Sequence, residues 1–388
     1  MIEARLKLLC DPASPRPESP DGAALWLGQG EIFGRTVRLH ARGGAALTPA
    51  DLSRLAAFLA EAGRHRTPLL GLFDSPGCQD GNGAALAAQS ACLAAARPAA
   101  PVISIVCGEA VGFDAVLAAQ ADFTLQAAPF GHAYMAGPAR VRAVTGAVLE
   151  AETLGAHAAD LPCGDEVEAL LAARALLDLA CGQSLREPVQ DEILHGLQTI
   201  LPLDPLAAYA PAALLAAITD SGCIALGPVA GLFTGLGRIG GRAVGLLASD
   251  STHQGGALDV AACRKGADFA ARCTRLGLPV VVLIDCPGFL PGLAQEQAGL
   301  PRAAACLAQA LAASPGIALT LRRGFGPAYA ALTAGATGHR LCWPGATIGG
   351  ATPVADPVQA QLVDRLIDPA QTRLDLTRAL SILAGDEA

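Results

Sequence analysis

The sequence contains few aromatic and few charged residues. Phe, Trp and Tyr make up 4% of the 388 residues and Asp, Glu, Lys and Arg 16%, whereas hydrophobic residues make up 52%. This composition excludes a disordered chain and predicts a compact protein with a core of Ala, Leu and Val, and with 44 glycines for turns and close packing. A formal net charge of −8 argues against a general nucleic-acid binder.

Patterns that mark metal sites, disulfides and membrane segments are also missing. The 12 cysteines lie mostly in apolar runs and form no C-x-x-C pair, which favours reduced thiols used as small hydrophobes. The first residues have no apolar stretch of signal-peptide length, and no uninterrupted apolar run could span a membrane. The histidines at positions 132, 157, 195, 253 and 339 lack metal-ligand spacing. We therefore expect a cytoplasmic protein that binds no metal, membrane or nucleic acid.

One short pattern occurs twice. FDSPGCQDG at positions 73–81 and IDCPGFLPG at 284–292 each follow an apolar run and indicate a buried strand that ends in a glycine turn. Further pairs accompany them, because GQGEIFGRTVRL from Gly28 resembles GLGRIGGRAVGL from Gly235, and Gly112 aligns with Gly326. These pairs indicate a tandem duplication with small changes in loop length.

Each copy has the same predicted order of elements. A glycine-rich hairpin is followed by an Ala/Leu helix, a buried strand with its DxPG turn, a second helix, another apolar strand, and a glycine turn that opens a helix. Repeated strand–helix–strand units predict α/β domains with largely parallel strands. We assign residues 1–22, which include PASPRPESPDG, to an extended N-terminal tail, residues 23–205 to an N-terminal domain and residues 206–388 to a C-terminal domain.

GLGRIG at positions 235–240 matches the dinucleotide-binding pattern G-x-G-x-x-G but not its context. That pattern requires a strand before it and a helix after it. Here RAVGLLAS follows, which indicates a strand, and the first copy lacks the third glycine. We therefore interpret GLGRIG as part of a hairpin.

The turns GEAVGFDAV and RGFGPAYAA are the candidate sites. A strand that bends at a glycine into a helix leaves the first helical N–H groups without intrahelical partners, and these donors can hold an oxyanion. The alternative is an ordinary structural turn. Near these turns, we expect Asp74 and Asp285 to cap the turns after their strands and Asp114 to begin a helix. The pair Arg322 and Arg323 could meet phosphate or face solvent.

The second half resembles a known family. PVVVLIDCPGFLPGLAQEQAG at 279–299, together with GLGRIGGRAVGLLASDS and IDPAQTRLDLTRAL, is similar to the carboxyltransferase (β) subunit of biotin-dependent acyl-CoA carboxylases of the propionyl-CoA and acetyl-CoA type. The first half resembles it more loosely, through PLLGLFDSPG and APVISIVCGEAVGFDAV. That family has two tandem crotonase-like α/β domains related by duplication, in agreement with the repeat found independently.

The resemblance implies a reaction that needs no nucleophilic side chain. An acyl-CoA thioester would bind the N-terminal domain and carboxybiotin on a partner carrier the C-terminal domain, while backbone N–H groups hold the enolate and the biotin ureido oxygen. By position, the donors belong to Gly112 and Phe113 on the thioester side and to Gly326 and Ala328 on the biotin side. The implied substrate-binding positions are Gly77, Gly288, Phe289 and Gln295. The implied partners are a biotin carboxylase with its biotin carboxyl carrier subunit, and further copies of this chain in a dimer or a trimer of dimers.

Departures from the family pattern leave other functions open. Where the family has Gly-Gly-Ala-Tyr, this chain has GPAY from Gly326, and Pro327 has no N–H to donate. The family's three glycines in the first domain are replaced by Gly112, Phe113 and Asp114, and an arginine-containing segment by CQDGNG. One alternative is a biotin-independent decarboxylase of malonyl-type thioesters that uses the same enolate. Another is a catalytically degenerate homologue that serves as a structural subunit.

Overall fold

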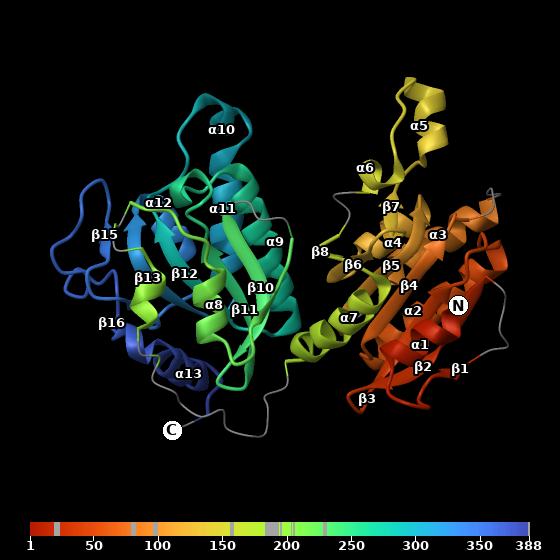
Figure 1. Cartoon of the computed structure of the whole chain (residues 1–388), viewed down its shortest axis with the longest axis horizontal. Helices are drawn as coiled ribbons and strands as arrows, with labels where there is room; N and C mark the ends of the chain where they lie inside the picture. Colours follow the sequence, from red (N-terminus) through yellow and green to blue (C-terminus); the bar gives the residue numbers. More distant parts are fainter. Residues whose placement is uncertain are drawn as a thin grey trace. The chain divides into compact units, whose positions relative to one another are not determined.

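Two eight-stranded sheets carry the fold, one in each half of the chain (Figure 1). The computed structural model describes residues 1–18, 24–78, 83–95, 100–155, 159–182, 194, 196–202, 204, 206–227 and 231–386. The halves form two compact units, Met1–Cys181 (unit 1) and Gly182–Ala388 (unit 2). This division precedes the boundary expected after residue 205, because Leu197 and Leu201 pack in the core of unit 2.

In unit 1 the strands follow the order β1-β2-β3-β4-β5-β6-β8, and β7 pairs with β5. The hairpin β2–β3 is antiparallel, and the pairs from β3 to β8 are parallel. Strands β4 and β5 coincide with the strands predicted at PLLGLFD and PVISIVC, and their continuous apolar runs match burial on both faces. The strands are β1 (Arg16–Pro17), β2 (Leu25–Ile32), β3 (Arg35–Arg42), β4 (Leu69–Ser75), β5 (Val102–Val111), β6 (Phe123–Ala127), β7 (His132–Tyr134) and β8 (Leu161–Cys163).

Helices cover the sheet of unit 1, where α2 packs on α3 and α1 packs on α7, while α5 projects from the unit (Figure 1, yellow). Helix α2 begins with a capping box, in which Thr48 and Asp51 bind each other's backbone N–H groups at 3.0 and 3.2 Å. The helices are α1 (Ile2–Leu9), α2 (Pro49–His65), α3 (Gly83–Ala95), α4 (Phe113–Ala119), α5 (Pro138–Thr145), α6 (Ala151–Gly155) and α7 (Glu166–Ala180).

Residues 1–18, the described part of the segment expected as an extended tail at 1–22, do not form such a tail. Its first part forms helix α1, in which Leu6 and Leu9 are buried. After this helix, Arg16–Pro17 pairs with β2 as an edge strand, a position where proline needs no ladder N–H. The expectation was wrong because the prolines lie after the helix and do not interrupt the apolar residues that bury its inner face.

Unit 2 repeats this design in the order β16-β14-β13-β12-β11-β10-β9, with β15 paired to β13. Here too an antiparallel hairpin, β10–β11, leads into parallel strands. The α/β fold with two tandem, duplicated domains is therefore confirmed. The strands are β9 (Cys223–Ala225), β10 (Leu232–Ile239), β11 (Arg242–Ser249), β12 (Val280–Cys286), β13 (Gly316–Phe325), β14 (Arg340–Cys342), β15 (Thr347–Gly349) and β16 (Arg365–Leu366).

GLGRIG lies in this hairpin, as the sequence indicates, because strand β10 ends at Ile239 and the turn follows. The turn residues Gly240 and Gly241 have φ of 57° and 79°, and their N–H groups donate to the Asp220 carboxylate at 3.0 and 2.7 Å.

The helices of unit 2 are α8 (Ala212–Ile218), α9 (Val260–Leu276), α10 (Leu293–Gln297), α11 (Leu300–Ala312), α12 (Gly326–Leu332) and α13 (Thr372–Leu383).

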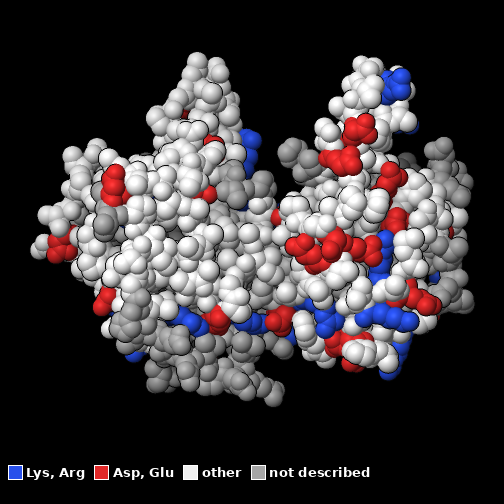
Figure 2. Space-filling view, in the orientation of Figure 1, with Lys and Arg blue, Asp and Glu red and all other residues white. Residues whose placement is uncertain are grey.

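The composition is reflected in the surface and in the thiols. Most of the face shown in Figure 2 carries no charge, and the charged side chains occur in small groups of mixed sign. The cysteines are free thiols, and Cys306 is the exposed one.

Within the part of the chain that the structure describes, no helix is both long and apolar enough to cross a bilayer. The same residues contain no cluster of three or more His, Cys, Asp or Glu side chains arranged for a metal; His157 and His195 lie outside them.

Candidate functional site

The DxPG turn and the glycine turn lie side by side in each unit. In unit 1 the register of β4 and β5 shifts by a bulge just before Ser75 pairs with Ala110. In unit 2 the register of β12 and β13 shifts at the corresponding place, just before Cys286 pairs with Gly324. Because these strands are parallel, both turns leave the same edge of the sheet. The duplicated motifs therefore form one structural site per unit.

In unit 1 the glycine turn joins β5 to α4. Gly112 has φ of 60°, and its N–H donates to the Tyr134 carbonyl at 3.0 Å. Val116 N–H donates back to the Gly112 carbonyl at 3.1 Å, so Phe113 is the first residue whose N–H has no partner within the helix. Gly77 lies against this turn, since a Cβ there would be 3.0 Å from the Val111 oxygen. The structure thus brings Gly77, Gly112 and Phe113 together, but the Gly112 N–H is already bonded.

In unit 2 the corresponding turn joins β13 to α12. Gly326 has φ of 61° and is half-buried, and a Cβ built on it would meet no atom within 4 Å. Pro327 lies in the first turn of α12, where a helix needs no N–H donor, which explains why the fold tolerates it. Ala328 is fully buried, at 0% exposure. Of the two residues expected to donate, Gly326 therefore has open space on the side where a Cβ would stand, and Ala328 is enclosed.

The other expected binding residues of unit 2 lie on the segment after β12. Gly288 has φ of 137° with open space around it, and its carbonyl accepts from Leu258 N–H at 3.0 Å. Phe289 forms an isolated bridge with Leu258. Gln295 is engaged elsewhere, because its Oε1 accepts from Val260 N–H at 3.0 Å and so caps the first turn of α9.

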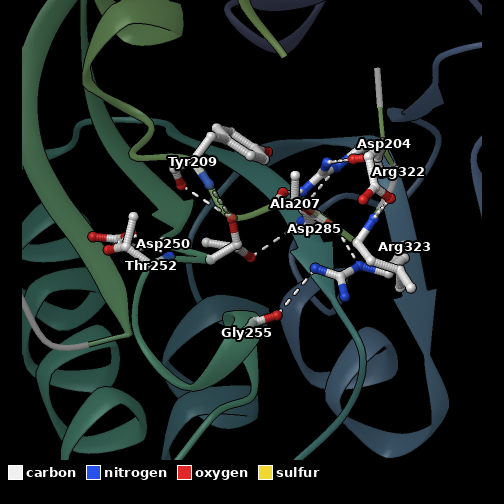
Figure 3. Close-up of polar contacts among 12 residues, drawn as sticks. Asp204, Ala207, Tyr209, Asp250, Thr252, Gly255, Asp285, Arg322 and Arg323 are labelled. Atoms are coloured by element: carbon white, nitrogen blue, oxygen red, sulfur yellow. Dashed lines mark hydrogen bonds and ion pairs between the residues drawn. The ribbon is translucent and has the colours of Figure 1, made fainter. Parts of the chain in front are cut away.

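A buried aspartate anchors the unit 2 site (Figure 3). Asp285 is 0% exposed and receives two guanidinium groups from β13. Arg322 Nε and Nη2 donate to Oδ2 at 2.9 and 2.6 Å, and Arg323 Nε donates to Oδ1 at 2.7 Å. Arg323 Nη2 also donates to the Gly255 carbonyl at 3.0 Å. These bonds fix the end of β12 against the strand that carries the glycine turn.

The segment before α8 completes this cluster. Arg322 donates to the carbonyls of Asp204 and Ala207 at 3.2 and 3.1 Å, and its guanidinium lies 4.6 Å from the centre of the Tyr209 ring. Burial raises the pKa of Tyr209 above its ordinary value, so the phenol stays protonated. Ser251 Oγ both accepts from Tyr209 N–H at 2.8 Å and donates to its carbonyl at 3.0 Å.

The matching aspartate of unit 1 is neutralised from another part of the chain. Asp74 Oδ2 accepts from Arg5 Nη1 of α1 at 2.8 Å, and the same guanidinium binds Glu166 at the start of α7 at 2.8 and 3.0 Å. Strand β5 has Gly108 beside Asp74, where a Cβ would lie 2.2 Å from the Asp74 Oδ1 atom. Gly108, which stands in the place of Arg322, therefore offers Asp74 no side chain.

These contacts correct three expectations. Asp74 and Asp285 form ion pairs instead of capping their turns, and Arg322 and Arg323 both pair with Asp285 instead of facing solvent as a free pair. Asp114 does begin a helix, as the second residue of α4. The arginine pair could have been found from its place on the strand next to Asp285, but no sequence signal connects Arg5 with Asp74.

Thiol chemistry has no support at either turn. Cys78, next to the unit 1 turn, has its pKa raised to about 12, chiefly by burial and then by the nearby Asp114 carboxylate. Burial likewise raises the pKa of Cys286, beside Asp285, to about 11. Both thiols are protonated at neutral pH. Neither thiol is therefore placed to act as a nucleophile at these turns.

The comparison with known proteins identifies the architecture. A model of the carboxyl transferase domain family matches residues 16–351. The chain belongs to the carboxyl transferase family. It is 29% identical to the propionyl-CoA carboxylase beta chain of Cereibacter sphaeroides, over 82% of this chain and 68% of that protein. It is 30% identical to the biotin-dependent acetyl-/propionyl-coenzyme A carboxylase beta6 subunit of Mycobacterium bovis, over 72% of this chain and 71% of that subunit.

A solved structure shares the whole architecture of this carboxyltransferase. Transcarboxylase 12S, a hexamer assembly described with hydrolysed methylmalonyl-coenzyme A bound, matches with a TM-score of 0.90 and 25% identity, over all of this chain and 90% of that one. The predicted family, the enzyme class and the pair of crotonase-like domains are thereby confirmed.

Proposed function

We propose that the chain transfers a carboxyl group from carboxybiotin to the α carbon of an acyl-CoA or acyl-carrier thioester. The observation that carries this proposal is the paired turn at which Gly112 and Gly326, both with positive φ, end a buried strand at the same edge of their sheets. Family membership supplies the reaction class. Each turn presents backbone dipoles, which suit a reaction whose charge develops on oxygen.

On the thioester side, the Phe113 N–H is the proposed donor to the enolate oxygen. The Gly112 N–H holds the turn through Tyr134, so its contribution is to fix the position of Phe113. Transfer of the α proton to the ureido nitrogen that has given up its carboxyl group as carbon dioxide would leave the electron pair shared between the α carbon and the thioester oxygen, and the α carbon would then attack the carbon dioxide. A hydrogen bond to that oxygen strengthens as the charge develops and so lowers the barrier. Gly77 would act by letting the DxPG turn pack against the Val111 carbonyl just before the glycine turn.

On the biotin side, the residues present fit a planar ureido group. Gly255, Gly288 and Gly326 each have no atom within 4 Å of the position a Cβ would take, which leaves room for a ring to approach the backbone. We propose the Gly326 N–H as the donor to the ureido oxygen, with Ala328 as a second donor if the first turn of α12 opens. Gly288 and Phe289 would border the ring, and Gln295 would act by holding the start of α9. Carboxybiotin supplies the carboxyl group when bound.

A proline substitution at Phe113 tests the thioester-side donor, because it removes the N–H together with the phenyl ring, and an alanine control removes the ring alone. Phe113 is the first residue of α4, a position that accepts proline, so Phe113→Pro deletes the N–H while the helix can still form. The matched control Phe113→Ala keeps the N–H. We expect Phe113→Pro to lower kcat about 100-fold, as for other lost oxyanion donors, and Phe113→Ala to lower it far less.

The assay combines the purified chain with biotin carboxylase, biotinylated carrier, ATP, labelled bicarbonate and a series of acyl-CoAs. Acyl-CoA-dependent fixation of label supports the proposal. Absence of fixation with every carrier and acyl-CoA, from a folded chain, would contradict it. Equal activity of the two Phe113 variants would remove Phe113 from the mechanism but leave the reaction standing.

A biotin-independent decarboxylase is the second candidate. It is favoured by the biotin-side turn, where Pro327 lacks an N–H and Ala328 is fully buried, while the thioester-side turn keeps an available donor. Release of carbon dioxide from malonyl-CoA or methylmalonyl-CoA without biotin would support this reading. A chain that binds no CoA thioester in either assay would instead fit a structural subunit.

We propose that the chain works in an assembly with other copies of itself and with a biotin carboxylase and its carrier. The projection of unit 1 around α5 exposes apolar side chains and buries none from the helix itself. Its exposed apolar residues include Met135, Val144 and Val148, at 68%, 79% and 69% exposure. Such a surface suits contact with a second copy. Sedimentation of the purified chain would test this, and a monomer at all concentrations would contradict it. The cytoplasmic location stays a prediction.

A further inference from the structure

A buried ion pair ties the first turn of α4 to the sheet of unit 1. Arg42, the last residue of β3, and Asp114, the second residue of α4, are both 0% exposed. Arg42 Nε and Nη2 donate to Asp114 Oδ1 at 3.2 and 3.1 Å. Asp114 Oδ2 is buried and has no hydrogen-bond partner among the described residues. The pair therefore meets at one carboxylate oxygen and leaves the other unsatisfied.

The groups around the pair are neutral and aromatic. The Arg42 guanidinium lies 4.3 Å from the centre of the Phe73 ring, and Arg42 Nη1 contacts His40 Nδ1. Because an arginine can only donate, His40 Nδ1 is the unprotonated nitrogen. Burial lowers the pKa of His40 well below its ordinary value, and the nearby Arg42 charge lowers it further. One positive and one negative charge are thus enclosed together.

Such a pair is costly, and unit 2 folds without it. Desolvation of two charges can exceed their attraction, so a buried ion pair is weak support for stability. The hairpin registers end with Leu25 opposite Arg42 and with Leu232 opposite Ser249, so Ser249 stands in the place of Arg42. Ala328 stands in the place of Asp114, two residues after the turn glycine. The pair is specific to the thioester-side turn.

We infer that Arg42 and Asp114 are positioning residues for the Phe113 N–H, an inference that rests on the proposed function. Helix α4 has only seven residues, and no side chain caps its N-terminus. Asp114 follows Phe113 directly, so its bond to Arg42 fixes the helical turn that presents the Phe113 N–H. Arg42 also offsets the Asp114 charge, which would otherwise oppose a negative oxygen at that turn.

The chain offers a closely matched control. Arg38 lies on the same strand, is 8% exposed, and its guanidinium lies 4.1 Å from the centre of the Phe58 ring. It pairs with Glu18 and Glu61 at 2.8 and 3.2 Å, away from α4. Arg38→Met and Arg42→Met therefore remove the same kind of side chain, but only the second frees the turn.

Hydrogen exchange tests the positioning independently of any activity. The Val116 N–H donates to the Gly112 carbonyl in the first turn of α4, so its exchange reports the opening of that turn. We expect Arg42→Met and Asp114→Asn to speed this exchange about tenfold or more relative to wild type, and Arg38→Met to leave it within about twofold. Equal exchange in all three variants would overturn the inference, even if the chain proved to have no transferase activity.

Kinetics separate positioning from mere stability. If the wild type transfers carboxyl groups, we expect Asp114→Asn to lower kcat about tenfold to 100-fold with KM nearly unchanged, because a misplaced donor chiefly weakens transition-state binding. Arg38→Met should keep kcat. If Asp114→Asn does not fold, the double variant Arg42→Met/Asp114→Leu replaces the pair with apolar volume and should fold. A double variant with wild-type kcat would overturn the inference.

Discussion

Arg5 Nη1 donates to Asp74 Oδ2 at 2.8 Å across 69 positions of sequence, and so supplies unit 1 with the positive charge that unit 2 obtains from its own strand β13. The two aspartates occupy equivalent bulges of a duplicated strand. Their partners are not equivalent. Duplication has therefore preserved the need to neutralise this carboxylate but not the residue that does so.

Loss of Arg5 should destabilise unit 1. Its side chain is 5% exposed and pairs with Asp74 and Glu166, so Arg5→Met leaves Asp74, at 21% exposure, without its cation. Breaking a well-buried pair costs about 3–5 kcal/mol, and we expect about 2–3 kcal/mol here because both carboxylates can be partly hydrated. Urea unfolding would measure this. Lys7→Met on the exposed face of the same helix is the control, with an expected change below about 0.5 kcal/mol.

Asp285→Asn should be more damaging. Asp285 is fully buried and holds both Arg322 and Arg323, so the amide removes the negative charge from both guanidinium groups and sets its NH2 donor against one of them. We expect a loss of about 3–5 kcal/mol in the free energy of unfolding, measured on the whole chain by urea titration. Asp268→Asn, an exposed change on α9, should stay within about 0.5 kcal/mol. Similar losses in the two variants would mean that the cluster contributes little.

Alkaline pH should destabilise the fold through its buried thiols. Burial raises the pKa of Cys78, Cys107, Cys263 and Cys273 from 9.0 to about 12. These folded-state values lie above the unfolded value, so the stabilisation is complete below pH 9 and is lost as pH rises toward 12. The urea midpoint should therefore fall between about pH 9 and 11.

Lys265 acts in the opposite direction. Burial lowers its pKa to about 8, so the folded state gains stability relative to the unfolded chain as pH rises from 8 toward the ordinary value of 10.5. One amine is outweighed by four thiols. Cys273→Ala should make the alkaline decline shallower, and an unchanged slope would show that this thiol does not contribute to it.

Pro327→Ala restores an N–H to the first turn of α12. If the missing donor limits carboxyl transfer, kcat should rise about tenfold or more, since one oxyanion-hole donor is worth roughly 3 kcal/mol in other enzymes. The unfolded chain becomes more flexible, so stability should fall by about 0.4–1 kcal/mol. An unchanged kcat would mean that position 327 does not donate a hydrogen bond in the reaction. Ala330→Gly, a change in the same helix that keeps every N–H group, is the control.

The fold could be predicted from the sequence because its helices and strands follow from local patterns of residues. The buried strands over PVVVLID and PLLGLFD, the helix over CRKGADFAARCTRLG and the hairpin over GLGRIGGRAVGL all depend on the spacing of apolar residues and glycines within short windows. Because the same order of elements occurs in both copies of the repeat, each copy supports the prediction made for the other. Strand β13 extends to Phe325, beyond the predicted GIALTLR, because the residues after it pair with β15.

The site could be predicted only in part. The turns at Gly112 and Gly326 follow from sequence, but their hydrogen bonds do not. The Gly112 N–H is taken by Tyr134, which lies on β7 and pairs with β5 only in the folded sheet. Arg5 and Arg42 reach their aspartates over 69 and 72 positions, and spacing patterns within a helix or strand carry no signal at that range. Long-range pairing depends on topology.

The order of synthesis treats the two bulge aspartates differently. Arg5 emerges from the ribosome before Asp74, so the cation is already present when β4 is synthesised. Asp285 emerges 37 positions before Arg322, and its charge stays unpaired until β13 follows. Unit 1 can therefore form the Arg5–Asp74 pair as soon as β4 has been synthesised. In unit 2 the Asp285–Arg322 pair can form only after β13 has followed β12.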